Sequence, residues 1–427
     1  MKSLYYEIKH CFNKVSIFAL LLFLLVVFLH SIIYLSIQCR TILPDGTLVE
    51  GLSSHRAFSE ASKELKGVLD DEYLQKLKKT YASSYEKKYL DIDKGFLGTG
   101  GLMKYINTNY LLNKPKSRFN ATNGNEYMEI DFPYLENVDT FYAAYKETLV
   151  EVEVQAHEAT GFRPYTDEEI KQIKDIVNNI QLPLRLDNTM WMSSTRNYLY
   201  LEYFIFTLVL CISFSSIFSR DGINPVSDIA LASKQGKNKY ICRRFIAGLV
   251  AAAIMYLIYF VFLSLIHGSV YGGFSGWNAS IQSKSNFYVF NMTAGKVFLL
   301  ECLGGLIGTL AVTSIVLLVS IIIKRTKASL LVSAGLVYFL NNQLKGYSIL
   351  RFTNPLFFKT DSMGTLISLF GRIVPYLVLI ILLGILYISI CFILVRLLGK
   401  RYRWLKWKIW FTQRTKEYGN IPWLYSP

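Results

Sequence analysis

The feature that most restricts the fold of this chain is a series of long apolar runs. A helix needs roughly 20 mostly apolar residues to cross about 30 Å of hydrocarbon. Five runs reach that length, and they occupy residues 15–37, 198–218, 245–266, 297–323 and 374–398. The chain is also 52% hydrophobic, with a mean hydropathy of +0.30. The sequence therefore predicts an α-helical polytopic membrane protein.

A sixth run, at residues 328–343, is shorter than the others. It reads "ASLLVSAGLVYFL" and continues into three uncharged polar residues. We interpret it as a sixth transmembrane helix with a polar end, and a re-entrant hairpin is the alternative. Lysines before the first run allow a signal peptide there, but the run is long and "LSIQCR" is a poor cleavage site, so we predict a retained span.

The charges are distributed unevenly along the chain. Residues 40–196 carry 20 Lys and Arg against 24 Asp and Glu, a net charge of −4, whereas the remainder carries 26 against 7, a net charge of +19. Because positively charged loops of membrane proteins stay in the cytoplasm, both termini are predicted to lie inside and residues 38–197 outside. The surplus of positively charged residues belongs to the membrane portion, which argues against nucleic-acid binding.

Each polar segment between the spans has an expected role. The expected order is an interfacial helix at 1–14, an extracellular domain at 38–197, a cytoplasmic insert at 219–244, an outer loop at 267–296, outer interfacial helices at 344–373 and a basic aromatic tail at 399–427. An unstructured leader is the alternative for the first segment. The tail, with Trp404, Trp407 and Trp410, is interpreted as an anchor at the inner headgroups or as a docking surface for a cytoplasmic partner.

The extracellular domain is expected to be mainly helical with some strand. Thr166 followed by Glu169 is a capping-box signature for a helix start. The alternation in "LVEVEV" predicts a strand after a helix in residues 139–157. Only Cys39 borders this domain, so it has no internal disulfide; with its Lys-, Ile-, Asn- and Tyr-rich composition, that favours a bacterial plasma membrane.

The chain carries none of the common catalytic motifs. It has no phosphate-binding loop, no H-E-x-x-H and no G-x-S-x-G sequence, and no Cys or His spacing typical of a metal site. The histidines are scattered, and we interpret each as a surface or interface residue: His10, His30, His55, His157 and His267. The sequence therefore predicts a protein that is not an enzyme.

Ionisable residues inside predicted spans are few, and such residues are often functional. Glu202 and Glu301 each lie about one turn into a span, near the outer face. They could line a polar cavity that belongs to a translocation path, or they could form structural pairs with Arg372 or Lys296. Structural pairing is the interpretation we favour.

The span that holds Glu301 also carries a small-residue face. Gly304 and Gly308 are four residues apart, which suits close helix packing. The middles of the spans are otherwise almost purely apolar, whereas a gradient-driven carrier generally needs polar groups there. A partner subunit is therefore the expected source of energy for any uphill movement.

The cytoplasmic insert reads "SRDGINPVSDIALASKQGKNKYICRRF" and contains its own short helix signal. Asn224 can cap a helix that has Pro225 in its first turn and ends at Gly236. Val226, Ile229 and Ala230 make one apolar face, and a helix of about nine residues is roughly 13 Å long. The alternative is a solvated basic loop.

This arrangement resembles the permease subunits of ATP-binding-cassette (ABC) exporters of the type-2 family. The resemblance rests on six spans, a surface helix at the N-terminus, a large domain between the first two spans, and the insert, where Gly236 with Lys237 and Arg243 or Arg244 match the family pattern. It implies that the insert couples the chain to an ATPase. The coupling residues it implies are Asp221, Gly222, Pro225, Val226, Asp228, Ile229 and Ala230.

The resemblance also implies the partners. A second permease chain, identical or homologous, would pair with this one, and separate ABC ATPase subunits would hold ATP and Mg²⁺, so this chain would bind no cofactor itself. The expected cargo is amphipathic or lipid-like, such as an antimicrobial peptide, moved by export or for immunity across a membrane whose lipids surround the chain. The alternatives are a non-transporting receptor or regulator that senses an extracellular ligand, and a secondary carrier.

Overall fold

The structure is a computed structural model that describes residues 2–38, 40–42, 48–62, 66–76, 138–159, 163–219, 236–283, 288–343, 352–358 and 365–418. Within these residues the protein is mostly helical, and five helices are long and apolar enough to cross a membrane. They are α2 (Lys14–Gln38), α8 (Met190–Phe214), α10 (Gly236–Val270), α11 (Ala294–Ile322) and α14 (Tyr376–Tyr418). The expected class of helical polytopic membrane protein is therefore supported by the structure.

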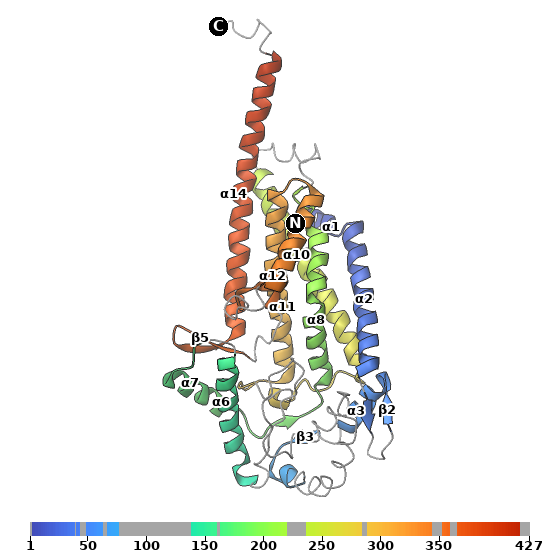
Figure 1. Ribbon diagram of the computed structural model, residues 1–427, viewed down its shortest axis with the longest axis vertical. Helices are drawn as coiled ribbons and strands as arrows, with labels where there is room; N and C mark the ends of the chain where they lie inside the picture. The colour runs from blue at the N-terminus through green and yellow to red at the C-terminus, as the bar shows by residue number, and fades with distance from the viewer. Residues whose placement is uncertain are drawn as a thin grey trace.

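The long helices form one bundle with two different ends (Figure 1). At the domain end lie α3 (Leu52–Ser62), α6 (Phe141–Ala159) and α7 (Asp167–Asn178). At the insert end, α8 finishes and α10 begins, on either side of residues 220–235, which lie outside the described residues. Both α1 (Lys2–Cys11) and the C-terminal part of α14 lie toward the insert end.

The predicted sixth span corresponds to α12 (Thr326–Gln343), a helix of 18 residues. It follows α11 after the short basic turn at 323–325 and packs against α8 and α11. It is not among the five helices that satisfy the length and hydropathy of a membrane span. Polar residues at both ends shorten its apolar stretch, so its place in the membrane belongs to the proposal below.

The N-terminal segment is helical, as expected. In α1, Leu4, Ile8 and Phe12 of the adjoining turn pack against the bundle core, whereas Tyr5 is 65% exposed. Asn13 ends this segment, because its Oδ1 accepts hydrogen bonds from Val15 N at 2.9 Å and Ser16 N at 3.0 Å. The side chain of Asn13 thus caps the start of α2 at the corner between the two helices.

Several helix boundaries differ from the expected ones. The predicted insert ended at residue 244, but α10 already begins at Gly236, so this glycine is the first residue of a long helix. The reason is that Ile241 and Phe245 of this first part are buried in the bundle core. The last predicted span, 374–398, likewise starts later, at Tyr376, and α14 continues through the predicted tail to Tyr418.

The domain end combines helices with short strands. The strand pairs are β1 (Arg40–Ile42) with β2 (Leu48–Glu50) and β3 (Gly67–Val68) with β4 (Arg185–Leu186), both antiparallel. The strand predicted at "LVEVEV" was wrong, since those residues are part of α6. Residues four apart on α6 are buried and set a helical period that outweighs the local alternation: Phe141, Tyr145, Leu149, Glu153 and His157.

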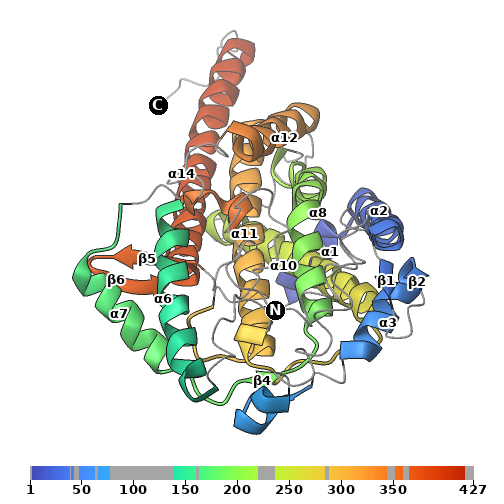
Figure 2. The same cartoon turned by 60° about the horizontal axis from the view of Figure 1, so that its bottom comes forward.

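The segment before α14 forms a β-hairpin, where interfacial helices were expected. Strand β5 (Leu366–Leu369) pairs with β6 (Arg372–Pro375), and a 3-10 turn, η6 (Pro355–Phe357), precedes them. The two-residue turn between the strands has positive φ at both Phe370 (52°) and Gly371 (78°), which matches the right-handed twist of the strands. Figure 2 shows the hairpin beside α7, where it leads into α14.

The other predicted outer loop, 267–296, also contains little helix of its own. The helix α10 continues to Val270, and α11 starts at Ala294. Between them the described residues form turns, the 3-10 turn η5 (Ile281–Ser283) and an isolated bridge between Ser280 and Thr293. Trp191 from α8 anchors this loop, because its Nε1 donates to Ser275 O at 2.8 Å.

Candidate functional site

A cluster of buried hydroxyl groups fixes the point where the insert leaves the bundle. Ser320 of α11 is fully buried, and its Oγ accepts hydrogen bonds from Phe218 N at 3.0 Å and Ser219 N at 3.2 Å. The same Oγ donates to Ser215 O at 2.8 Å. One side chain therefore binds three backbone groups at the end of α8, just before the insert.

A second contact joins this point to α12. The Oγ of Ser219 donates to Ser215 O at 2.9 Å and lies 3.1 Å from Thr326 Oγ1. Since Ser219 is the last described residue before 220–235, the chain enters the insert from a position held by α8, α11 and α12 together. We call Ser215, Ser219, Ser320 and Thr326 the hydroxyl cluster.

Arg244 holds the other side of the insert. Its Nη1 donates to Ile217 O at 2.8 Å, and its Nε donates to Glu7 Oε2 at 3.2 Å. The guanidinium also lies 4.6 Å from the ring centroid of Tyr240. Arg244 thus connects α10 with α1 and with the end of α8, and it is one of the two arginines that the resemblance indicated.

The residues expected to couple the chain to an ATPase lie outside the described residues. They are Asp221, Gly222, Pro225, Val226, Asp228, Ile229 and Ala230. The structure therefore locates the two attachment points of the insert. The helix predicted within it stays a prediction.

Glu202 lies inside the bundle and meets a histidine of α2. It is 4% exposed, and its Oε1 is 2.9 Å from His30 Nδ1. Tyr259 Oη of α10 donates to the other oxygen, Oε2, at 3.4 Å. Glu202 therefore joins three helices, and its partner is His30, not the Lys296 or Arg372 named from the sequence.

Glu301 belongs to a second polar group nearer the domain end. It is 2% exposed; its Oε1 accepts a hydrogen bond from Tyr288 Oη at 2.7 Å and lies 3.5 Å from Arg196 Nη1. Arg196 Nη1 also donates to Tyr288 Oη at 3.1 Å. A carboxylate, a guanidinium and a phenol thus form one buried group that links α11, α8 and the loop before α11.

The small-residue face of α11 lies where other chain segments come closest. Gly304, Gly305 and Gly308 are all buried. A Cβ at Gly308 would be 2.7 Å from Pro355 O, and one at Gly305 would be 2.2 Å from Tyr256 Oη. Glycine is needed at both positions because a methyl group has no room there.

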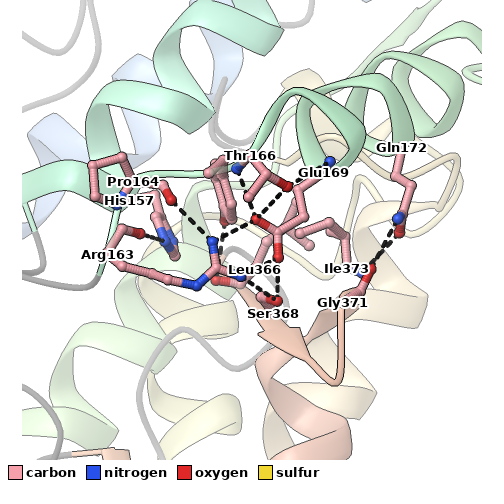
Figure 3. A network of polar contacts seen from close by, with 11 residues as sticks. His157, Arg163, Pro164, Thr166, Glu169, Gln172, Leu366, Ser368, Gly371 and Ile373 are labelled. Atoms are coloured by element: carbon pink, nitrogen blue, oxygen red, sulfur yellow. Dashed lines mark hydrogen bonds and ion pairs between the residues drawn. The ribbon is translucent and has the colours of Figure 1, made fainter.

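A third group of polar contacts joins the domain end to the hairpin, as Figure 3 shows. Glu169 in the first turn of α7 is 1% exposed, and the guanidinium of Arg163 binds both its oxygens, with Nη1 2.8 Å from Oε2. Ser368 of β5 donates to Oε1 of the same carboxylate. The backbone N of Thr166 donates to Oε2 at 2.8 Å, so the predicted capping box is confirmed.

These contacts stabilise the ionised form of Glu169. The hydrogen bonds from Arg163, above all, lower the pKa of the Glu169 carboxyl to about 2, against the opposing effect of burial. His157 stacks on Tyr165 with ring centroids 3.6 Å apart, and burial lowers the pKa of its imidazole below the ordinary value. The ionised carboxylate and the neutral imidazole therefore lie side by side in this contact.

Gln172 extends the same contact to the far end of the hairpin. Its Nε2 donates to Gly371 O at 3.0 Å, and its Oε1 accepts from Ile373 N at 3.0 Å. The side-chain amide thus donates one hydrogen bond to the hairpin backbone and accepts one from it, as a backbone peptide group of a neighbouring strand would. We call Arg163, Glu169, Gln172 and Ser368 the clamp, because they hold α7 against the hairpin that leads into α14.

Sequence reasoning missed the partners of both intramembrane carboxylates, although a signal was present. His30 lies near the domain end of the first apolar run, at the depth where Glu202 enters the second. Arg196 lies two residues before the second run, at the end where Glu301 enters the fourth. Ionisable residues at matching depths of antiparallel spans are candidates for pairing.

The hydroxyl cluster, the two buried carboxylate groups and the clamp hold helices in place and pair buried charges. Among the residues that the structure describes, no three His, Cys, Asp or Glu side chains are close enough together to hold a metal ion. The free thiols Cys11 and Cys211 are buried. The described polar groups suit mechanical connection between helices.

Comparison with known proteins adds no relative. No family model matches the chain, and neither the curated proteins nor the solved structures contain a match. Function must therefore be inferred from the chain itself.

Proposed function

We propose that this chain is the transmembrane subunit of an ATP-driven exporter of the ABC type-2 kind. It would pair with a second permease chain and with separate ATPase subunits, which would hold ATP and Mg²⁺. The observation that best supports this proposal is the fixation of both ends of the insert. The hydroxyl cluster holds Ser219 against α8, α11 and α12, and Arg244 holds α10 against α1 and the end of α8, so a force on residues 220–235 would reach five helices.

The mechanical requirement for coupling is a short element whose movement is not lost in a flexible joint. The backbone N–H groups of Phe218 and Ser219 donate hydrogen bonds to Ser320 Oγ and keep the first joint short, because they reach the residue directly before 220–235. At the second joint, α10 starts at Gly236 and continues into the bundle without a break. An insert helix pushed by an ATPase would then move α8 and α10 as rigid bodies.

The topology that we propose has six spans, with α12 as the fifth. The cation-rich insert end would face the cytoplasm of a bacterium with both termini, and the domain end would be extracellular. Support comes from the packing of α12 against α8 and α11, and from the buried Ser329 and Ser333 on this helix. A short span with a buried polar side is tolerated when neighbouring helices cover that side.

The cargo that we propose is amphipathic or lipid-like, such as an antimicrobial peptide. The described spans expose many large apolar side chains, and their buried carboxylates already have His30 and Arg196 as partners. These carboxylates would then be structural pairs, not a polar path for a small ion. Export to the medium and protection of the membrane against the peptide use the same direction of movement.

A receptor or regulator is the second candidate, and one observation favours it. The clamp fixes α7 to the hairpin β5–β6, and α14 follows this hairpin directly and continues to Tyr418 (Figure 1). A ligand that moved α7 could shift a single helix that runs from one end of the bundle past the other. In that case no ATPase would be needed.

Purification of the tagged full-length chain from its native membrane in mild detergent tests the proposal. We expect an ATPase subunit with a G-x-x-x-x-G-K-[ST] loop to be recovered in near-stoichiometric amount and identified by mass spectrometry. Complete absence of such a subunit, with the chain folded and monodisperse, would remove the exporter proposal and leave the receptor.

A further inference from the structure

The hairpin that leads into α14 has an unusual tip. Phe370 has a φ of 52°, and its side chain is fully exposed, at 103% of the reference area. A bulky residue in the left-handed region is unfavourable, and a large exposed aromatic ring loses the benefit of burial. Residues in such conformations are often found where a surface has a binding role.

The two faces of the hairpin have different neighbours. Leu366 and Ile373 belong to the core cluster of the domain end, and Ser368 takes part in the clamp. Ile367 belongs to a separate cluster with Tyr376 of α14, and the half-buried Leu369 and Val374 pack against that cluster. The hairpin is therefore a thin layer with the domain-end helices on one face and apolar residues on the other.

The position of this layer relative to the membrane follows from α14. Strand β6 ends at Pro375, and α14 begins at the next residue, Tyr376. Side chains within the first turns of α14 are turned outward, with Leu382 54% and Ile385 60% exposed, and lipid must surround them if α14 spans the membrane. In Figures 1 and 2 the hairpin projects sideways from this start, beside α7, so its tip lies beside the bundle at the level where α14 begins.

We infer that the β5–β6 hairpin binds the membrane surface at the domain end. Phe370 enters the boundary between headgroups and acyl chains, where aromatic rings are favoured. Arg372, which is exposed and directly follows the turn, binds a lipid phosphate, because a guanidinium fits phosphate oxygens in a bidentate manner. The inference needs only that α14 spans the membrane, so it is independent of the exporter proposal.

This contact would give the clamp a second role. Because α7 is joined to the hairpin by Glu169 and Gln172, lipid binding at Phe370 also sets the height of α7 above the bilayer. The partner of the hairpin tip is then the lipid surface itself. Contact of the tip with a second copy of the chain or with another protein would contradict this assignment.

A photocrosslinking experiment tests the contact directly. The full chain carrying Phe370→p-benzoylphenylalanine is reconstituted into vesicles of phosphatidylethanolamine and phosphatidylglycerol, irradiated and analysed by intact mass. We expect adducts with the mass of one lipid, at a yield within about twofold of the same substitution at Leu382, which is lipid-facing on α14. The substitution at exposed Lys171 on α7 is the matched water-facing control and is expected to give at least tenfold less.

The alternatives are separated by the same measurement. Lipid adducts at Leu382 but none at Phe370 would overturn the inference, and so would an adduct of Phe370 with a second protein chain. Arg372→Glu in the Phe370-substituted chain is expected to lower the lipid-adduct yield severalfold in vesicles rich in phosphatidylglycerol. An unchanged yield would overturn the assignment of Arg372 to the lipid phosphate.

Discussion

The guanidinium of Arg163 binds both oxygens of the Glu169 carboxylate, and this pair joins the loop before α7 to the buried start of that helix. Glu169 is 1% exposed, whereas the side chain of Arg163 is 56% exposed. The carboxylate also accepts from Ser368, so the pair is connected to the hairpin that precedes α14. A buried anion with this many donors makes the clamp sensitive to substitution and to pH.

Glu169→Gln is expected to loosen the clamp. The substitution removes the charge that Arg163 and Ser368 bind, and hydrogen bonds to a charged group contribute about 2 kcal/mol. Hydrogen–deuterium exchange of the purified chain should become faster in α7 and in residues 366–375. Glu168→Gln, an exposed neighbour in the same helix turn, is the matched control and should change exchange little. Equal effects of the two variants would contradict the clamp.

Acid should weaken the same contact in a defined range. The pKa of Glu169 falls from its ordinary 4.5 to about 2 in the folded chain, so its contribution is complete above about pH 4.5 and is lost as pH falls toward 2. Burial lowers the pKa of the His157 imidazole from 6.5, so protonation of His157 disfavours folding. The folded state therefore also becomes less stable as the pH falls below 6.5. Thermal unfolding of wild type and Glu169→Gln at stepwise lower pH should therefore converge. A constant difference down to pH 2.5 would be evidence against the ionised Glu169.

Glu202→Gln is expected to affect stability more than activity. The carboxylate pairs with His30 and accepts from Tyr259, and an interhelical hydrogen bond inside a membrane contributes roughly 1 kcal/mol. The variant should unfold at a lower temperature in detergent but keep ATP-dependent transport in vesicles. His30→Gln, which removes the other partner, should lower stability by a similar amount. If either variant folds normally and abolishes transport, the carboxylate belongs to a translocation path, as in a gradient-driven carrier.

Ser320→Ala is expected to uncouple the insert from the bundle. It leaves two buried backbone N–H groups at Phe218 and Ser219 without their acceptor, which costs about 2 kcal/mol locally. Protease cleavage of residues 220–235 should become faster, and stimulation of the partner ATPase should decrease. Ser264→Ala is the control, because Ser264 of α10 donates to Phe260 O within its own helix. Similar behaviour of both variants would contradict a special role of the hydroxyl cluster.

The sequence predicted the parts of the fold that are set by long, strong patterns. Five apolar runs became five candidate spans, and the Thr166–Glu169 spacing became a capping box. Prediction from the sequence failed where a local pattern competes with packing against residues far away in the chain. The alternation in "LVEVEV" at 149–154 is typical of a strand, but burial of Tyr145, Leu149 and Glu153 on one side makes the segment helical.

The polar partners were harder to predict for a physical reason. Arg163 and Ser368 are about 200 residues apart in sequence yet bind the same carboxylate, and only the docking of the hairpin onto α7 brings them together. The same holds for Ser320 and Ser219, which meet because α11 and α8 are packed side by side. The pairing of such residues depends on the tertiary structure.

The most direct test of the exporter proposal is the amount of ATPase subunit that co-purifies with an Ile229→Asp variant. Ile229 lies on the predicted apolar face of the insert helix, whereas Ser227 lies outside that face and points away from Ile229, so Ser227→Asp adds the same charge where no contact is expected. We predict at least a tenfold loss of bound ATPase for Ile229→Asp and near-normal binding for Ser227→Asp, with both variants inserted and folded. Equal retention of the ATPase by both variants would contradict the coupling role of the insert.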